Sequence, residues 1–310
     1  DKNGDIIWRW KTRRRFMTCP TVLKREKETA LIFAADNSGQ MTCLDGNGKV
    51  VWQVDLIAGA EGSASVVADI DNNGTYEVVQ TDMSGTIWVF DALNGKVINQ
   101  AKLDQGLPVS PAVGDLDGDG NLEIVISTND GSINVFSNNL VKLWSYKIGG
   151  FSETWSTSAP VIFSASDEEV YIIAASSIGD VYCINHLGKP VWKYPTKVPI
   201  ASTISVGDFD QNGVADIFLI TQAGVIYRFD ENGSKLWNIE MQGRSLAPGA
   251  ILDINNDKKL EYIFSTQRGN MFVLDNDGNV IFNHQFNSRT INVTPSFGNV
   301  SSSSKLDVVL

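Results

Sequence analysis

Carboxylates stand at alternate positions in one short segment of the chain, which reads DLDGDGNLE from Asp115 to Glu123. Their oxygens are of the kind that Ca²⁺ prefers, and glycine permits a sharp turn between them. In a helical EF-hand the bidentate glutamate stands at the twelfth loop position, which is Ile126 here. The acid arrives instead at the ninth position, and the residues around it, LEIVIS, have the composition of a strand. The segment therefore predicts a calcium loop that joins two antiparallel strands.

The same spacing recurs in three further loops, which begin at Asp69, Asp208 and Asp253. The residues assigned to the four loops are Asp69, Asp71, Asn73, Thr75 and Glu77; Asp115, Asp117, Asp119, Asn121 and Glu123; Asp208, Asp210, Asn212, Val214 and Asp216; and Asp253, Asn255, Asp257, Lys258 and Glu261. The fourth loop has Lys258 where the others have glycine, and whether it binds metal stays open. Carboxylates crowded in one loop repel one another, so calcium is expected to stabilise the fold.

Turn residues recur in phase with these loops and show which elements must hold them. A glycine opens a strand at Gly39, Gly85, Gly131, Gly179, Gly224 and Gly269. A second turn, of the Asn-Gly or Asp-Gly type, leads into a strand that carries an aromatic residue. These aromatic positions are Trp8, Trp52, Trp144, Trp192, Trp237 and Phe282, with Asn99 as the exception, and they lie 44 to 48 residues apart. Because a residue repeated once per unit usually packs between units, we expect the tryptophans to pack between neighbouring repeats.

Each repeat holds four short strands, which at a period of about 40 to 45 residues is typical of a propeller blade. We therefore expect an all-β fold, a single seven-bladed β-propeller domain of four-stranded blades over residues 1–310. Blades 1 to 6 are assigned to residues 12–56, 57–103, 104–148, 149–195, 196–240 and 241–286, and blade 7 to residues 287–310 plus 1–11. The termini would share blade 7 and close the ring. The third strand of blade 7 has no counterpart in the sequence, so we expect a flanking segment of a longer chain, or a neighbouring chain, to supply it.

Composition narrows the classes of partner. The 310 residues carry a formal net charge of −11, which argues against nucleic acid and anionic membrane surfaces. No run of eighteen apolar residues exists, so we expect no membrane insertion by this segment. Three cysteines, Cys19, Cys43 and Cys183, are too few and too scattered for a disulfide framework or a CxxC metal pair. The chain begins at Asp1 without a methionine or an apolar signal region, which suggests a mature or excised segment with flanking domains.

The motif DxDxDGxxE at 115–123 and its three relatives resemble the FG-GAP repeats of integrin alpha-chain propellers and their bacterial counterparts. The resemblance implies up to four structural Ca²⁺ ions, held between the first and second strands of four blades on one face. The phenylalanine-glycine and glycine-alanine-proline signatures of that family are weak here, as in Ser296-Phe297-Gly298. A second resemblance competes: segments 44–52 and 90–97 are similar to the tryptophan-docking repeats of quinoprotein propellers. Those enzymes have eight blades and an adjacent cysteine pair, which the sequence lacks.

The face opposite the calcium loops is where small ligands or partners of propellers commonly bind. The predicted blades place arginines of blades 1, 6 and 7 there, and two aromatic residues of an irregular segment could form a contact surface. The candidates are Arg13, Arg14, Arg15, Phe151, Trp155, Arg244, Arg268 and Arg289. Because arginine matches carboxylates in a bidentate manner, this face favours an anionic partner, such as a protein carboxylate or an acidic glycan.

Catalysis finds little support in the residue types. The two histidines, His186 and His284, have no cysteine or carboxylate partner at metal or triad spacing. The sequence therefore favours a non-catalytic, calcium-stabilised module for binding, adhesion or scaffolding that recognises a protein or glycan. We expect it outside the cytosol, in an extracellular, cell-surface or periplasmic setting where calcium is plentiful. The alternative is the propeller domain of an enzyme of the polysaccharide-lyase or quinoprotein kind.

Overall fold

The computed structural model describes residues 5–16, 19–104, 108–149, 158–166, 169–200, 203–241, 243, 245, 247–286, 296–298 and 307–309. All regular elements in these residues are β-strands. They are short runs rich in valine, isoleucine and aromatic residues, bounded by glycine, asparagine and aspartate, as strands and turns require. The predicted all-β class is confirmed.

Six sheets contain four strands each, and we keep the names blade 1 to blade 6 for them. Blade 1 is β1 (Thr21–Leu23), β2 (Leu31–Ala35), β3 (Gln40–Asp45) and β4 (Val50–Asp55). Blade 2 is β5 (Val66–Ala68), β6 (Glu77–Thr81), β7 (Thr86–Asp91) and β8 (Val97–Lys102). Blade 3 is β9 (Ala112–Gly114), β10 (Glu123–Ser127), β11 (Ser132–Phe136) and β12 (Lys142–Lys147).

The later blades follow the same plan. Blade 4 is β13 (Val161–Ser164), β14 (Val170–Ala175), β15 (Asp180–Asn185) and β16 (Pro190–Pro195). Blade 5 is β17 (Ser205–Gly207), β18 (Asp216–Ile220), β19 (Val225–Asp230) and β20 (Lys235–Glu240). Blade 6 is β21 (Ala250–Leu252), β22 (Glu261–Ser265), β23 (Asn270–Leu274) and β24 (Val280–Gln285). A two-stranded sheet of β25 (Ser296–Gly298) and β26 (Asp307–Val309) follows.

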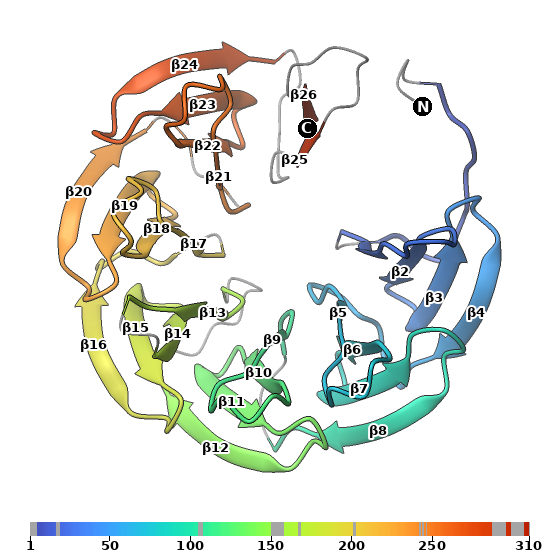
Figure 1. The fold of residues 1–310 in the computed structure, drawn as a ribbon. Helices are drawn as coiled ribbons and strands as arrows, with labels where there is room; N and C mark the ends of the chain where they lie inside the picture. The colour runs from blue at the N-terminus through green and yellow to red at the C-terminus, as the bar shows by residue number, and fades with distance from the viewer. Residues whose placement is uncertain are drawn as a thin grey trace. The chain divides into compact units, whose positions relative to one another are not determined.

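Within each blade the chain meanders, so that consecutive strands lie side by side (Figure 1). The second strand of blades 2, 3, 5 and 6 is buried along its whole length, whereas the fourth strand of the first five blades alternates between more and less exposed residues. An irregularity in register recurs between the third and fourth strands of all six blades, for example between Val135 and Phe136. The repeat is therefore conserved in register as well as in strand order.

The described chain divides into two compact units. The first unit holds residues 6–162 with 186–188, and the second holds the described residues of 163–185 and 189–309 together with Asp5. In the first unit, the Thr21 hydroxyl of β1 donates a hydrogen bond to the carbonyl of Ser65, just before β5, at 2.6 Å. In the second unit, the Ser205 hydroxyl of β17 donates to the carbonyl of Gly249, just before β21, at 2.7 Å. Such bonds join neighbouring blades within each unit.

Five tryptophans join blades by one repeated contact. The indole N–H of each donates to a carbonyl in the turn before the fourth strand of the next repeat, at 2.8–3.0 Å. The pairs are Trp8 with Gly46, Trp52 with Ala92, Trp144 with His186, Trp192 with Glu231, and Trp237 with Asn276. A glycine with positive φ in each turn lies against the indole, and a Cβ there would come within 2.5–3.3 Å of it. The expected packing of tryptophan between repeats is confirmed.

Asn99 occupies the tryptophan position of blade 2 and makes the same connection with a smaller group. Its side-chain amide donates to the carbonyl of Asn139 at 2.7 Å. The turn that receives this bond has Leu140 with φ of 59° where the other turns have glycine. A smaller partner than an indole leaves room for a side chain in the turn, so the two replacements belong together.

The seventh blade is not fully within the described residues. Residues 1–4, 287–295, 299–306 and 310 lie outside them, so the count of seven, the shared blade and its missing strand remain predictions. In the part of the chain that the structure describes, there is no helix of the length and apolar character needed to cross a membrane.

Candidate functional site

The four predicted calcium loops are the hairpins between the first and second strands of blades 2, 3, 5 and 6. We call them the 69 loop (residues 69–77), the 115 loop (115–123), the 208 loop (208–216) and the 253 loop (253–261). In the 69, 208 and 253 loops the first aspartate accepts hydrogen bonds from the backbone amides of the fifth and sixth residues, at 2.8–3.2 Å. In the 115 loop the amides of Gly118 and Gly120 donate to Asp115 at 2.7 and 3.0 Å. The sequence pattern thus marks one recurring backbone structure.

The closing acid of each loop is buried beneath the turn. Glu77, Glu123, Asp216 and Glu261 are 3–4% exposed, and each accepts a hydrogen bond from the amide of the second loop residue at 2.9–3.0 Å. Burial raises the pKa of Glu123, and the carboxylates of Asp117, Asp119 and Asp115 raise it further, against the Leu116 hydrogen bond. Burial and neighbouring aspartates also raise the pKa values of Glu77 and Glu261. In these three loops, negative charge is gathered beyond what the backbone amides neutralise.

Two residues in each loop adopt the left-handed conformation. The sixth residue has φ of 85°, 88° and 86° at Gly74, Gly120 and Gly213, and 71° at Lys258. The 253 loop therefore has the same turn as the others although a lysine replaces glycine. An L-residue in this conformation is strained, because its Cβ approaches the following carbonyl oxygen.

The carboxylate oxygens lie close enough together to hold a cation in three of the four loops. Oxygens of the first, third and ninth residues lie within 4.8 Å of one another in the 69, 115 and 208 loops. The 253 loop has the neutral Asn255 at the third position and is not among the groups of this kind found in the described residues. The donor sets of the 69 and 115 loops, three or four carboxylates with amide and carbonyl oxygens, fit Ca²⁺.

The 208 loop contains a cation that the sequence reading missed. Arg228, on β19, is 4% exposed, and its guanidinium bonds the two loop carboxylates Asp216 and Asp210. Its Nε lies 2.7 Å from Asp216 Oδ1, and its Nη2 lies 2.6 Å from Asp210 Oδ2 and 3.1 Å from Asp216 Oδ2. The signal was present in the sequence, since strand positions that match Arg228 in register hold Val89, Val135 and Val273.

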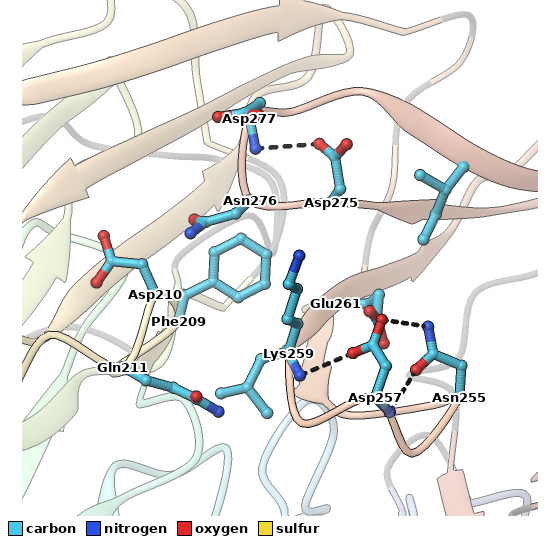
Figure 2. Close-up of a pocket in the computed structure, with 12 residues that line it drawn as sticks. Phe209, Asp210, Gln211, Asn255, Asp257, Lys259, Glu261, Asp275, Asn276 and Asp277 are labelled. Carbon is cyan, nitrogen blue, oxygen red and sulfur yellow. Dashed lines mark hydrogen bonds between the residues drawn. The ribbon is translucent and has the colours of Figure 1, made fainter.

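A pocket of about 590 Å³ in the second unit lies beside these loops (Figure 2). It is lined by parts of the 208 and 253 loops and by the turn from Asp275 to Asp277. Twelve residues line it, and their charged members are five acids and one lysine: Asp210, Asp257, Glu261, Asp275, Asp277 and Lys259. Figure 2 shows the Lys259 side chain extending from its loop toward Asn276. The pocket is on the side of the blades that carries the calcium loops, not on the opposite face where we expected a ligand.

The arginines predicted for the opposite face are only partly described. Arg13 lies 3.9 Å from Asp55, and both side chains are more than two-thirds exposed. Arg14, Arg15 and Arg268 are exposed as well. Phe151, Trp155, Arg244 and Arg289 lie outside the described residues. The positive patch that these residues would form together therefore remains a prediction.

Two of the cysteines are buried, and one histidine contacts an aromatic ring. Burial raises the pKa of both Cys43 and Cys183 to about 12, so these two thiols stay protonated and unreactive. The His284 ring contacts the edge of Phe286, with ring centroids 4.6 Å apart.

Comparison with known proteins places the fold. A search of curated proteins finds no significant match. The structure resembles that of BamB from Moraxella catarrhalis, with a TM-score of 0.65 and 17% identity over 96% of this chain and 81% of that one. It also resembles BBS1N in complex with ARL6DN (TM-score 0.67, 12% identity, 95% and 89% covered). The Vibrio cholerae biofilm matrix protein Bap1 is a third similar structure (0.57, 13%, 94% and 84%). The fold is an all-β propeller.

The sequence profile of one family matches nearly the whole chain, in two overlapping parts, residues 1–177 and 143–307. The FG-GAP assignment, which rested on a nine-residue motif, is not supported by this match. The segments 44–52 and 90–97, which suggested the competing resemblance, lie within the matched residues. The chain belongs to the PQQ_2 family, which is described as outer membrane protein assembly factor BamB.

Proposed function

We propose that the chain is a non-catalytic protein-interaction scaffold of the cell envelope, working on its periplasmic side. The observation that carries the proposal is the match to the family of an outer membrane protein assembly factor along nearly the whole chain. A similar propeller, BBS1N, is described in complex with ARL6DN, a further instance of the fold binding a protein. Adhesion and glycan binding, which the sequence also left open, receive no comparable support.

The partner contacts the acidic pocket of the second unit. Five carboxylates and one lysine are the charged lining, and Phe209, Leu260 and Ile281 are the apolar lining. Three neutral polar residues complete it: Gln211, Asn255 and Asn276. A lysine or arginine side chain of the partner suits such a pocket, because its stem is apolar and its head is cationic. This assignment replaces the anionic ligand on the opposite face as the proposed partner chemistry.

Calcium bound to the 69 and 115 loops stabilises the scaffold and takes no part in chemistry. The support is the clustering of three carboxylate oxygens within 4.8 Å in each loop, together with the raised pKa values of Glu77 and Glu123. A bound cation would relieve the repulsion that burial imposes on these acids. Since calcium binds the folded loops, it adds stability by mass action.

A photo-crosslinking residue in place of Gln211, at the pocket, tests the scaffold proposal in cells that produce the whole protein. We expect one dominant protein adduct, which is lost when Asp257→Asn and Asp277→Asn remove charge from the pocket. The same probe at the exposed Lys235 on β20 is the matched control and should give no such adduct. An adduct that is insensitive to the two substitutions would contradict the pocket, and a bound quinone chromophore or cleavage of a polysaccharide by the purified protein would contradict the non-catalytic assignment.

A further inference from the structure

We propose that the 208 loop carries its own cation, the guanidinium of Arg228, and takes no calcium. The inference rests on the calcium proposed for the 69 and 115 loops, because it concerns what replaces the metal in a third copy of the same hairpin. The chain would then use one backbone structure with two kinds of cation, one exchangeable and one covalently attached.

The contacts of Arg228 account for every donor of its side chain. Nε and Nη2 bond Asp216 and Asp210, the ninth and third residues of the loop, which are ligand positions in the calcium pattern. Nη1 bonds both the backbone carbonyl of Asn276, at 2.9 Å, and its side-chain oxygen. A guanidinium has five N–H donors, and all five have acceptors here. The geometry is that of a built ion pair.

The loop itself has changed to admit the guanidinium. Its closing acid is Asp216, one methylene shorter than the Glu77 and Glu123 of the 69 and 115 loops, and yet it accepts the same amide bond at 2.9 Å. The neutral fifth residue, Asn212, is shared with Asn73 of the 69 loop and does not separate the two kinds of loop. The shorter closing acid leaves space in the 208 loop, and this suits a larger cation of single charge.

The position of Arg228 in the sheet excludes an ordinary surface role. It pairs in register with Phe218 on one side and Trp237 on the other, and its guanidinium carbon lies 5.1 Å from the centre of the Phe209 ring. The matching residues of blades 2, 3 and 6 are valines. A buried arginine at a position built for valine requires compensating charge, and the loop supplies it.

A tethered cation gives blade 5 a property that the calcium loops lack. A guanidinium stays charged at all pH values that proteins encounter, and it cannot dissociate or be removed by a chelator. Through Asn276 the same side chain also joins blade 5 to the turn before β24 of blade 6. The 208 loop should therefore stay closed, and its wall of the acidic pocket stay in place, whatever the calcium concentration.

Calcium stoichiometry of purified full-length variants tests the inference, measured by titration calorimetry and by metal analysis after dialysis. Arg228→Val, and the double variant Arg228→Val with Asp216→Glu, should each bind one equivalent more than the unaltered protein. Lys235→Val, which removes one positive charge from an exposed position, should bind the same number. Adding Asp208→Asn to the double variant should abolish the extra equivalent.

One further variant keeps the test decisive if loss of Arg228 impairs folding. Asp208→Asn alone should leave calcium binding unchanged if arginine holds the loop, and should remove one equivalent if the loop already binds metal, which would overturn the inference. Folded Arg228 variants that gain no calcium would overturn it as well. Failure of the calcium proposal looks different, because Asp115→Asn and Asp69→Asn would then leave binding unchanged.

Discussion

The 115 loop and the 208 loop have the same hairpin and differ in the charged side chains around their closing acid. Both fold a first aspartate onto the amides of the turn and bury a closing acid beneath it. In the 115 loop the third, fifth and ninth residues are all acids, whereas in the 208 loop Arg228 bonds the third and ninth. The difference teaches that one hairpin can carry different charge arrangements, and under our proposal calcium takes in the 115 loop the place that Arg228 takes in the 208 loop.

The two solutions have different consequences for the blades that contain them. A loop that takes calcium, as we propose for the 115 loop, is more stable when the ion is present, so the stability of its blade depends on the calcium concentration. A loop that contains an arginine is independent of the ion, but it depends on one side chain. Four changes test this contrast: removal of Arg228, removal of calcium, substitution of the sixth loop residue, and a change of pH.

Removal of the Arg228 guanidinium should cause the largest loss of stability. In chelator, Arg228→Ala leaves Asp216 and Asp210 without their partner, and breaking a buried pair costs about 3–5 kcal/mol of unfolding free energy. Urea unfolding measures the loss. The matched control is Lys147→Ala, since Lys147 pairs with Asp130 at 2.7 Å but is 58% exposed, and such pairs contribute about 0–1 kcal/mol. Equal losses in the two variants would mean that Arg228 is an ordinary surface ion pair.

Removal of the exchangeable cation should have the next largest effect. A site held at about 100 times its dissociation constant contributes about 2.7 kcal/mol, so excess chelator should lower the melting temperature. Differential scanning calorimetry with and without calcium measures the change. Asp115→Asn should reduce the calcium-dependent part of the shift, whereas Asp208→Asn should leave that part unchanged. A melting temperature that does not change in chelator would contradict the proposal that calcium stabilises the 69 and 115 loops.

Substitution of the sixth loop residue, which has a left-handed backbone, should change the free energy of unfolding by about 1 kcal/mol or less. The sign depends on whether glycine is introduced or removed. Lys258→Gly relieves the strain of φ 71° in the 253 loop and should raise the free energy of unfolding, while Gly213→Ala should lower it. Gly213 is suited to this test because a Cβ there would meet no atom within 4 Å, so the change reports conformation alone. Thermal unfolding of both variants checks the opposite signs. A stabilising Gly213→Ala would show that the turn places no demand on its sixth residue.

The smallest effect is expected from pH in the presence of chelator. The folded chain holds the proton of Glu123 more tightly than the unfolded chain, whose pKa is near the ordinary value of 4.5. Stability should therefore fall as pH rises from that value through the raised pKa of the folded state. Glu123→Gln should make the fall shallower, as melting temperatures from about pH 4 to 7 would measure. In excess calcium the trend should reverse, because the ion competes with protons for the same oxygens.

The strands and turns could be predicted from the sequence, because the residues that specify each of them lie close together in the chain. Alternation, turn glycines and a usually aromatic position that recurs every 44 to 48 residues all act within a single repeat, so periodicity predicted the six four-stranded sheets that the described residues form. The predicted ligands are equally local, since those of each loop lie within nine consecutive residues. Even the turn at Lys258 follows the pattern, although its residue type argued against it.

The content of the 208 loop was not predictable from the loop. Arg228 lies twelve residues beyond Asp216, on the next strand, and only the register of β18 with β19 brings its side chain to the carboxylates. The acidic pocket likewise combines three segments from two blades. The sequence predicted a propeller, but the nine-residue acidic motif resembles FG-GAP repeats, an assignment that the family match does not support. The segments 44–52 and 90–97, which resemble quinoprotein repeats, lie within the residues that match the PQQ_2 family.

The tryptophan contacts between blades also equip the molecule with built-in optical reporters. Five of the eight indoles have the same partner, a turn carbonyl, and the same covering glycine, each at a different junction. Indole emission responds to the loss of such a hydrogen bond and to entry of water, so a variant in which phenylalanine replaces every tryptophan except one of these five would make a single junction visible. The junction of Asn99 with Asn139 has no chromophore at this position and is silent in such a measurement. Unfolding followed by the emission of these indoles would therefore report the five junctions that a tryptophan bridges. It would not report the junction between blades 2 and 3, where Asn99 makes the contact.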